Sequence, residues 1–309
     1  MKLIKGSHLL KDINLKNPVI TIGNFDGLHL GHQMIIKNAF QRAKAIGGVS
    51  VIYTFDPHPL AVLAPHKAPP TITTFAEKVQ LLKKTPLDVL VCEKFTKKFA
   101  GYSPEEFIEN ILYKRFHPKE ILIGHDYAFG KNRKGSASLL KKMGKALGFT
   151  VWEIRDIRID NIPVRSTTIR NFVKKGDVYE AGRLLGRLYS LSGTVVKGKQ
   201  RGIGFPTANL KPEKNLIPQN GIYVIRAQTP CGTYGGVVNI GTCPTFGENQ
   251  RTIEVHLFDF DKALYGKKIS ILFIDRLRGE KKFKDAGSLA AQIEKDVKRA
   301  KNILQHFTE

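Results

Sequence analysis

The sequence predicts an α/β domain with a Rossmann-like parallel sheet, followed by an antiparallel β-barrel domain that ends in one helix. In the first part, short β-branched runs alternate with helical segments, which is typical of a parallel sheet with helices on both faces. After about Gly186, strand-like runs follow one another between glycine- and proline-rich turns, as in a barrel or sandwich. The 309 residues suit two domains, and the change of pattern places their boundary near residues 182–188.

The expected elements alternate in the first domain and then become a series of strands. The strands of the parallel sheet are Val19–Ile22, Ser50–Phe55, Val89–Cys92, Ile121–Ile123 and Thr150–Ile154. Helices are expected at residues 31–46, 75–83 and 138–147, and a further one opens with Ser103 as N-cap and Pro104 behind it. The barrel strands are expected at residues 191–196, 222–227, 235–240, 252–258 and 268–274. An apolar stripe predicts a final amphipathic helix over residues 288–307.

Charge and cysteine usage narrow the class of protein. The chain has 50 Lys and Arg against 27 Asp and Glu, a net charge of +23, which attracts polyanions. The basic residues are scattered doublets without interleaved aromatics, a pattern that favours phosphate-bearing substrates over a nucleic-acid partner. Cys92, Cys231 and Cys243 form no C-x-x-C pair, and no apolar run is long enough to span a bilayer. We therefore expect a cytoplasmic protein without a membrane partner.

The first candidate site is the stretch from Gly23 to His32, Gly-Asn-Phe-Asp-Gly-Leu-His-Leu-Gly-His. It joins an expected strand to the start of an expected helix, where unpaired backbone N–H groups point toward an anion. Its glycines let the backbone approach phosphates closely. His29 and His32 are three residues apart, so both rings can face one side of the first turn and stabilise charge at an α-phosphorus.

A second motif supports this interpretation, because H-x-G-H alone also fits two surface histidines in a turn. Ser166-Thr167-Thr168-Ile169-Arg170 lies at an expected loop-to-helix start, and its hydroxyls and guanidinium suit phosphate groups. The two motifs together are the pattern of nucleotidylyltransferases. The candidate ATP-binding residues of this domain are Gly23, Phe25, Asp26, His29, His32, Ser166, Thr167 and Arg170, with His29 and His32 as the catalytic candidates.

Two further segments follow expected strands and predict the acceptor pocket. They are residues 54–59 and 124–130, at the carboxyl ends of strands where open α/β sheets bind ligands. Phe55, Tyr127 and Phe129 offer ring faces for an aromatic acceptor, although each of these side chains taken alone fits a hydrophobic core better than a site.

The barrel domain carries a second candidate phosphate site between Lys197 and Leu210. Gly198, Gly204 and Lys199 belong to a glycine-rich cationic loop suited to a polyphosphate, which is not a Walker A loop. Thr207 and Asn209 would face the same side of an extended segment, where their oxygens suit Mg²⁺. Glu254 shares a strand face with His256 and Phe258. It is the candidate general base, although an exposed strand glutamate fits the same pattern.

With these residues, nearly the whole sequence resembles the bifunctional bacterial riboflavin kinase/FMN adenylyltransferases, the prokaryotic FAD synthetases. The resemblance includes residues 23–33, 54–59, 124–130, 166–170, 185–187, 204–210, 239–241, 244–246, 254–257 and 277–280. It implies that residues 185–309 phosphorylate riboflavin to FMN with ATP. It further implies that residues 1–184 join FMN to the AMP part of a second ATP, giving FAD and pyrophosphate.

The resemblance also implies residue roles. Thr207 and Asn209 would hold Mg²⁺–ATP, Glu254 would be the base of the kinase, and Asp126 would contact the flavin with Phe55, Pro57 and Phe129 nearby. Two positions depart from the family pattern, Arg165 before Ser166 and Cys243 before Pro-Thr-Phe. Arg165 adds a cation that either strengthens phosphate binding or points to solvent.

Two other functions remain open from the sequence. One is a nucleotidylyltransferase with a different acceptor and a vestigial C-terminal domain, against which the motif at residues 204–210 argues. The other is a nucleic-acid-binding or regulatory protein on this scaffold, which the net charge of +23 would fit. The sequence does not indicate the oligomeric state.

Overall fold

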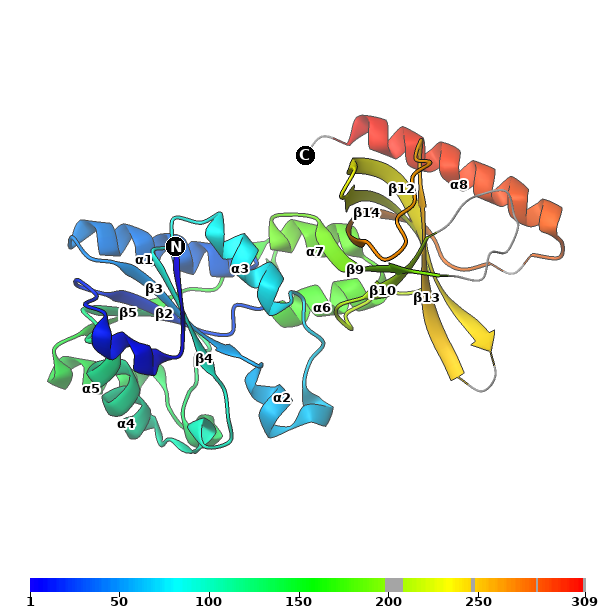
Figure 1. Cartoon of the computed structure of the whole chain (residues 1–309). Coiled ribbons are helices and arrows are strands. Elements are labelled where there is room, and N and C mark those ends of the chain that lie inside the picture. The colour runs from blue at the N-terminus through cyan, green and yellow to red at the C-terminus, as the bar shows by residue number, and fades with distance from the viewer. Residues whose placement is uncertain (198–207, 246–247, 282, 308–309) are drawn as a thin grey trace. The chain divides into compact units, whose positions relative to one another are not determined.

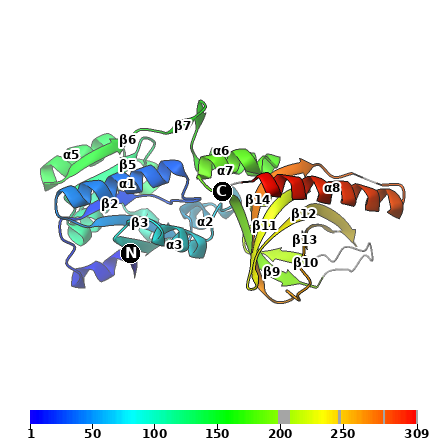
Figure 2. The same ribbon diagram turned by 90° about the horizontal axis from the view of Figure 1, so that it is seen from above.

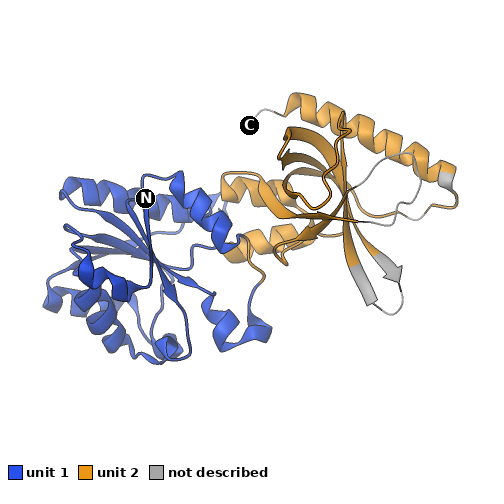
Figure 3. Cartoon of the chain, in the orientation of Figure 1, with its two compact units in different colours: residues 1–69, 73–165 blue, residues 70–72, 166–309 orange. Residues whose placement is uncertain are grey.

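The computed structural model describes residues 1–197, 208–245, 248–281 and 283–307 (Figure 1). The chain forms two compact units (Figure 3). Unit 1 consists of residues 1–69 and 73–165, and unit 2 consists of residues 70–72 and 166–309. The predicted fold class is confirmed for both parts of the chain.

Unit 1 is built on a six-stranded sheet with the strand order β1-β4-β3-β2-β5-β6, in which every pair is parallel. The strands are β1 Lys2–Lys5, β2 Val19–Ile22, β3 Ser50–Asp56, β4 Val89–Lys94, β5 Glu120–Gly124 and β6 Thr150–Ile154. The helices are α1 Leu30–Ala45, α2 Pro59–Leu63, α3 Phe75–Lys83, α4 Pro104–Glu106, which continues as the π-helical segment Phe107–Phe116, and α5 Ala137–Leu147. A small hairpin, β7 Arg158–Ile159 and β8 Ile162–Pro163, follows the sheet.

Helices cover both faces of this sheet, as its strands require. Alternate side chains of β3 point to opposite faces: Tyr53 packs in the core that contains Phe107 and Phe116, and Ile52 packs in the core that contains Ile36 and Leu82. Figure 1 shows α1 and α3 on one side of the sheet and α4 and α5 on the other. The central strands β2, β3, β4 and β5 are buried on both faces, which explains why they are continuous apolar runs in the sequence.

Unit 2 contains a closed antiparallel barrel with the strand order β10-β13-β12-β11-β14-β9. The strands are β9 Tyr189–Val196, β10 Ala208–Pro212, β11 Gly221–Thr229, β12 Gly232–Thr245, β13 Glu248–Leu257 and β14 Lys268–Arg278. Helix α8 Ala286–His306 lies along the outside of the barrel, where Ala300 and Val297 pack on Val224 and Ile274 (Figure 2). The predicted apolar stripe of the last helix therefore covers barrel strands.

Two further helices belong to unit 2, α6 Ser166–Lys175 and α7 Val178–Leu185. Helix α7 contacts β9 and β14. The segment 70–72 joins the same unit, since Arg170 Nε donates to the Pro70 carbonyl at 2.9 Å and Lys214 Nζ donates to the Ile72 carbonyl at 2.6 Å. The compact units thus separate after Arg165, whereas the sequence pattern placed the boundary at residues 184/185, just before the first barrel strand.

Candidate active sites

The loop after β2 has the strand–loop–helix setting that the sequence predicts. Its first residue is tied to the neighbouring strand, because Gly23 N–H donates to the Tyr53 carbonyl at 3.1 Å. Phe25, Gly27 and Leu28 have φ angles of 48°, 85° and 42°. Left-handed backbone is unfavourable for residues with a Cβ, so the surrounding contacts must hold Phe25 and Leu28 in this shape. The chain then enters α1 within a few residues.

His29 is the N-cap of α1, and its side chain accepts the backbone N–H of His32 at Nδ1, over 3.3 Å. The two imidazoles are stacked, with centroids 3.6 Å apart and planes at 18°, and the ring of Phe25 meets His32 edge-on at 5.1 Å. The prediction that both histidines lie on one side of the first turn is confirmed. Because Nδ1 of His29 is an acceptor here, a neutral ring carries its proton on Nε2, which is then a donor.

Gly31 is required by the position of His29. A Cβ at residue 31 would lie 3.1 Å from atoms of the His29 ring and 3.4 Å from the Val164 carbonyl oxygen. Such a contact is closer than most Cβ atoms make, so a side chain here would require the His29 ring to shift by a few tenths of an ångström. The glycine of H-x-G-H therefore makes room for the first histidine.

Asp26 is buried, with 6% of its surface exposed, and it braces the loop from within. Its Oδ1 accepts the backbone N–H of Thr73 at 3.0 Å and the Thr73 hydroxyl at 3.2 Å. The Gly27 N–H in turn donates to the Thr73 hydroxyl oxygen at 3.0 Å. These bonds fix the loop against the segment before α3. Thr73 was not recognised from the sequence, because it stands 47 residues from Asp26 and carries no motif of its own.

The residues predicted for the acceptor pocket differ in their surroundings. Phe55 is half-buried, with its ring centroid 5.7 Å from that of Phe95. Pro57 and Asp126 are exposed after the ends of β3 and β5. Phe129 is only 7% exposed and packs in the core, 5.6 Å from Phe107 between ring centroids. Phe129 is therefore a core residue in this structure, whereas Pro57 and Asp126 are accessible to a ligand.

The second phosphate motif opens α6, as its sequence predicts. Ser166 is the first residue of the helix, Thr167 is exposed, and Arg170 is 9% exposed with the Pro70 contact described above. Arg165 precedes the helix in unit 1, where its Nε donates to Asp156 Oδ2 at 3.1 Å and its terminal nitrogen forms an ion pair with the same carboxylate. The extra cation at position 165 is thus engaged by Asp156.

In the barrel, a row of polar side chains spans neighbouring strands. Asn209 on β10 lies opposite Glu254 on β13, and Glu254 lies opposite Asn239 on β12. Asn239 Nδ2 donates to Glu254 Oε2 at 3.4 Å. Directly opposed residues share a face, so the three side chains lie together although up to 45 residues separate them. The candidate residues Gly198, Lys199, Gly204 and Thr207 lie outside the described residues.

Burial shows that this row is on the outer face of the barrel. Ile253 and Val255, which flank Glu254, are 3% and 1% exposed, while Glu254 itself is half-buried. The predicted alternation along β13 is confirmed. Beyond Asn239, the same line of paired residues crosses Ile222 on β11 and reaches Arg278 on β14. Arg278 forms an ion pair with Asp296 of α8 at 2.7 Å. Asn239 had no predicted role, because only the strand register shows that it faces Glu254.

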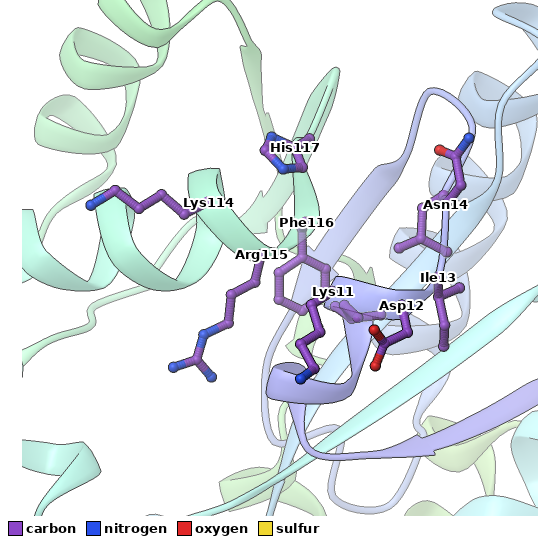
Figure 4. Close-up of a pocket in the computed structure, with 10 residues that line it drawn as sticks. Lys11, Asp12, Ile13, Asn14, Lys114, Arg115, Phe116 and His117 are labelled. Carbon is purple, nitrogen blue, oxygen red and sulfur yellow. The ribbon is translucent and has the colours of Figure 1, made fainter.

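Unit 1 contains a cavity of about 450 Å³ (Figure 4). Residues 10–15 and 114–117 line it, and these segments lead into the amino-terminal ends of β2 and β5. The candidate loops follow the carboxyl ends of strands instead. The cavity therefore lies at the opposite edge of the sheet from the loop at residues 23–32.

In the described parts of the chain, no three or more His, Cys, Asp or Glu side chains are grouped to hold a metal ion. None of the helices in those parts is both long enough and apolar enough to cross a bilayer.

The fold defines a class: a two-module protein that joins a parallel α/β sheet, with a loop and a helix start after β2, to a closed antiparallel barrel. Comparison with known proteins gives the particular family. The FAD synthetase family matches residues 11–168, and the riboflavin kinase family matches residues 185–304. The chain belongs to the bifunctional riboflavin kinase/FMN adenylyltransferases. It is therefore an enzyme of FAD biosynthesis, and the second match argues against a vestigial C-terminal domain.

Relatives of this family match along nearly their full length. The bifunctional riboflavin kinase/FMN adenylyltransferase of Buchnera aphidicola subsp. Acyrthosiphon pisum is 39% identical over 96% of both chains. Those of Bacillus subtilis and Escherichia coli K12 are 37% and 33% identical, over 95% and 96% of this chain and 94% and 96% of theirs. A solved structure described as a macrolide-efflux protein from Streptococcus pneumoniae is 29% identical and aligns over the whole of both chains with a TM-score of 0.86.

Proposed function

We propose that FMN adenylylation takes place at the loop of residues 23–32, with ATP phosphates at the start of α1. The observation that carries this proposal is the stacked pair of His29 and His32 at the N-terminus of a helix. Helix N-termini favour anions, and two imidazoles at one phosphate can stabilise the charge that develops during transfer. Ser166, Thr167 and Arg170 are proposed to bind the remaining phosphates, and Gly23, Phe25 and Asp26 to form the loop around them.

The adenylyl transfer needs no covalent enzyme intermediate. The FMN phosphate attacks the α-phosphorus of ATP, and pyrophosphate leaves. The protein contributes positioning and electrostatic stabilisation. Pro57 and Asp126, which are exposed at the carboxyl edge of the sheet, are proposed to contact the flavin together with Phe55, and Phe129 supports them from the core.

We propose the row on the outer barrel face as the riboflavin kinase site. Glu254 would accept the proton of the riboflavin 5′-hydroxyl as it attacks the γ-phosphorus, and Asn239 would hold the carboxylate through its 3.4 Å hydrogen bond. Asn209, opposite Glu254, is placed to bind the ATP phosphates with Thr207 and the loop residues Gly198, Lys199 and Gly204.

Mg²⁺ is proposed as the cation of the kinase site. The side-chain oxygens of Thr207 and Asn209 are of the hard type that Mg²⁺ prefers, and substrate phosphates would complete its coordination beside Glu254, which lies opposite Asn209. When bound, Mg²⁺ would neutralise charge on the transferred phosphoryl group. Thr207 and Asn209 are the proposed protein ligands.

Three broader proposals follow from the same features. Residues 1–184 are the proposed adenylyltransferase domain and residues 185–309 the proposed kinase domain. We propose a cytoplasmic location, which the unpaired Cys92 and Cys231 support. The proposed partners are the small molecules ATP, riboflavin and FMN, without nucleic acid.

One assay tests the proposed chemistry. The protein is incubated with riboflavin and Mg²⁺–ATP, and FMN and FAD are separated by chromatography. We expect FMN to appear first and FAD to follow, with both absent when EDTA removes the divalent cation. Formation of FMN in the presence of EDTA would contradict the role of Mg²⁺, and failure to convert added FMN to FAD would contradict the adenylylation step.

A further inference from the structure

A buried lysine contacts the candidate ATP-binding loop of residues 23–32. Lys78 of α3 is 7% exposed, and its Nζ donates to the backbone carbonyl of Asn24 at 2.6 Å. The Thr54 hydroxyl of β3 donates to the same carbonyl at 3.4 Å. Asn24 Nδ2 in turn meets His58 Nε2 at 3.2 Å. Asn24 is thus the point at which α3, β3 and the N-cap of α2 all hold the loop.

The direction of this carbonyl determines the direction of the next amide. The Asn24–Phe25 peptide is trans, and in a trans peptide the C=O and the following N–H point in opposite directions. With the Asn24 carbonyl turned inward to Lys78, the N–H of Phe25 points away from α3. Phe25 has a φ of 48°, a conformation that persists in a residue with a Cβ only where the surroundings enforce it.

We propose that Lys78 is a positioning residue for adenylyl transfer, which turns the Phe25 N–H toward the phosphates of ATP by holding the Asn24 carbonyl. This inference rests on the proposed placement of ATP at residues 23–32. Lys78 does not touch the reacting atoms. A fixed N–H donor contributes more than a mobile one, because its orientation costs nothing at the moment of reaction.

Burial lowers the pKa of Lys78, and the nearby Asp26, Cys92 and Asp56 offset part of this effect. Asp26 belongs to the same loop and is itself held by Thr73. Lys78 and Thr73 therefore brace the loop at two points, and both lie in or just before α3.

The test compares Lys78→Met with Lys83→Met, an exposed lysine of the same helix. For each variant, KM and kcat of FMN adenylylation are measured against ATP and against FMN, and riboflavin phosphorylation is measured in the same preparation. We expect Lys78→Met to raise the KM for ATP about tenfold, with the KM for FMN and the kinase rate unchanged. Lys83→Met should match the parent protein.

An unchanged KM for ATP in Lys78→Met would overturn the proposal, as would an equal rise in the KM values for ATP and FMN. If Lys78→Met does not fold, Thr54→Val decides, because it removes the other donor to the Asn24 carbonyl and keeps the side-chain shape. We expect it to raise the KM for ATP about twofold, and no change would then overturn the proposal. If His29→Ala also leaves adenylylation intact, the placement of ATP itself is wrong.

Discussion

The two sites of this chain are built in different ways. The proposed adenylyl-transfer site is dominated by one continuous stretch of the chain, residues 23–32, which folds as a loop and a helix start. The proposed kinase site combines Asn209, Asn239 and Glu254 from three strands, and only the register of the barrel brings them together. A contiguous site keeps its signature in the sequence, whereas a site made by strand pairing is visible only once the pairing is known.

This difference predicts which changes affect one activity alone. The largest effect is expected for Glu254→Gln, which removes the proposed general base but keeps the size of the side chain. Riboflavin phosphorylation should fall about 10²–10⁴-fold, while added FMN is still converted to FAD at the parent rate. Separate assays of the two half-reactions measure this, and a normal kinase rate would remove Glu254 from the mechanism.

The second largest effect is expected on adenylylation, when a side chain is added inside the loop of residues 23–32. Gly31→Ala places a Cβ 3.1 Å from the His29 ring, so the imidazole must move. Adenylylation should fall about 10- to 100-fold, because small displacements of a catalytic group are costly. Gly101→Ala serves as a control, since no atom lies within 4 Å of the position of its added Cβ and its backbone is not left-handed. Equal rates in both variants would show that His29 does not need its present position.

A third change alters the partner of Glu254. Asn239→Asp places a second carboxylate opposite Glu254, which disfavours the ionised form that accepts the proton. The acidic limb of the kinase pH–rate profile should therefore move to higher pH, and adenylylation should keep its own profile. Asn239→Ala, which adds no charge, should lower the rate without this displacement. Identical profiles for parent and Asn239→Asp would separate Asn239 from the base.

The smallest effect is expected at Arg165. Its guanidinium is paired with Asp156 and is 48% exposed, and exposed ion pairs contribute little. Arg165→Ala should change the KM for ATP in adenylylation less than about twofold. A rise of tenfold or more would mean that Arg165 leaves Asp156 and binds phosphate.

Much of unit 1 is encoded locally and could be predicted from the sequence. Helix α3 has a complete capping box between Thr74 and Glu77, and its predicted bounds of residues 75–83 are those observed. Strands β2 and β6 also have their predicted bounds. β1 was missed because its four residues include Lys2 and Lys5 at the edge of the sheet, so that it lacks a continuous apolar run.

The parts that sequence reasoning missed depend on contacts between distant residues. Part of strand β10 was included in the candidate phosphate site between Lys197 and Leu210, and only the pairing of β10 with β9 and β13 identifies it as a strand. Lys78 reads as one more lysine of a basic chain until α3 is packed against the loop. Phe129 offered a ring face in the sequence, but the fold places it in the core. In each case tertiary packing, not local propensity, determines the role.

The most direct test of the account is a variant with His29→Ala and His32→Ala, supplied with riboflavin and Mg²⁺–ATP. Both histidines belong to the proposed adenylyl-transfer site, and neither belongs to the proposed kinase site. FMN should therefore accumulate at the parent rate while no FAD forms. Continued formation of FAD, or loss of FMN production in a protein that still folds, would contradict the assignment of the two reactions to two separate sites.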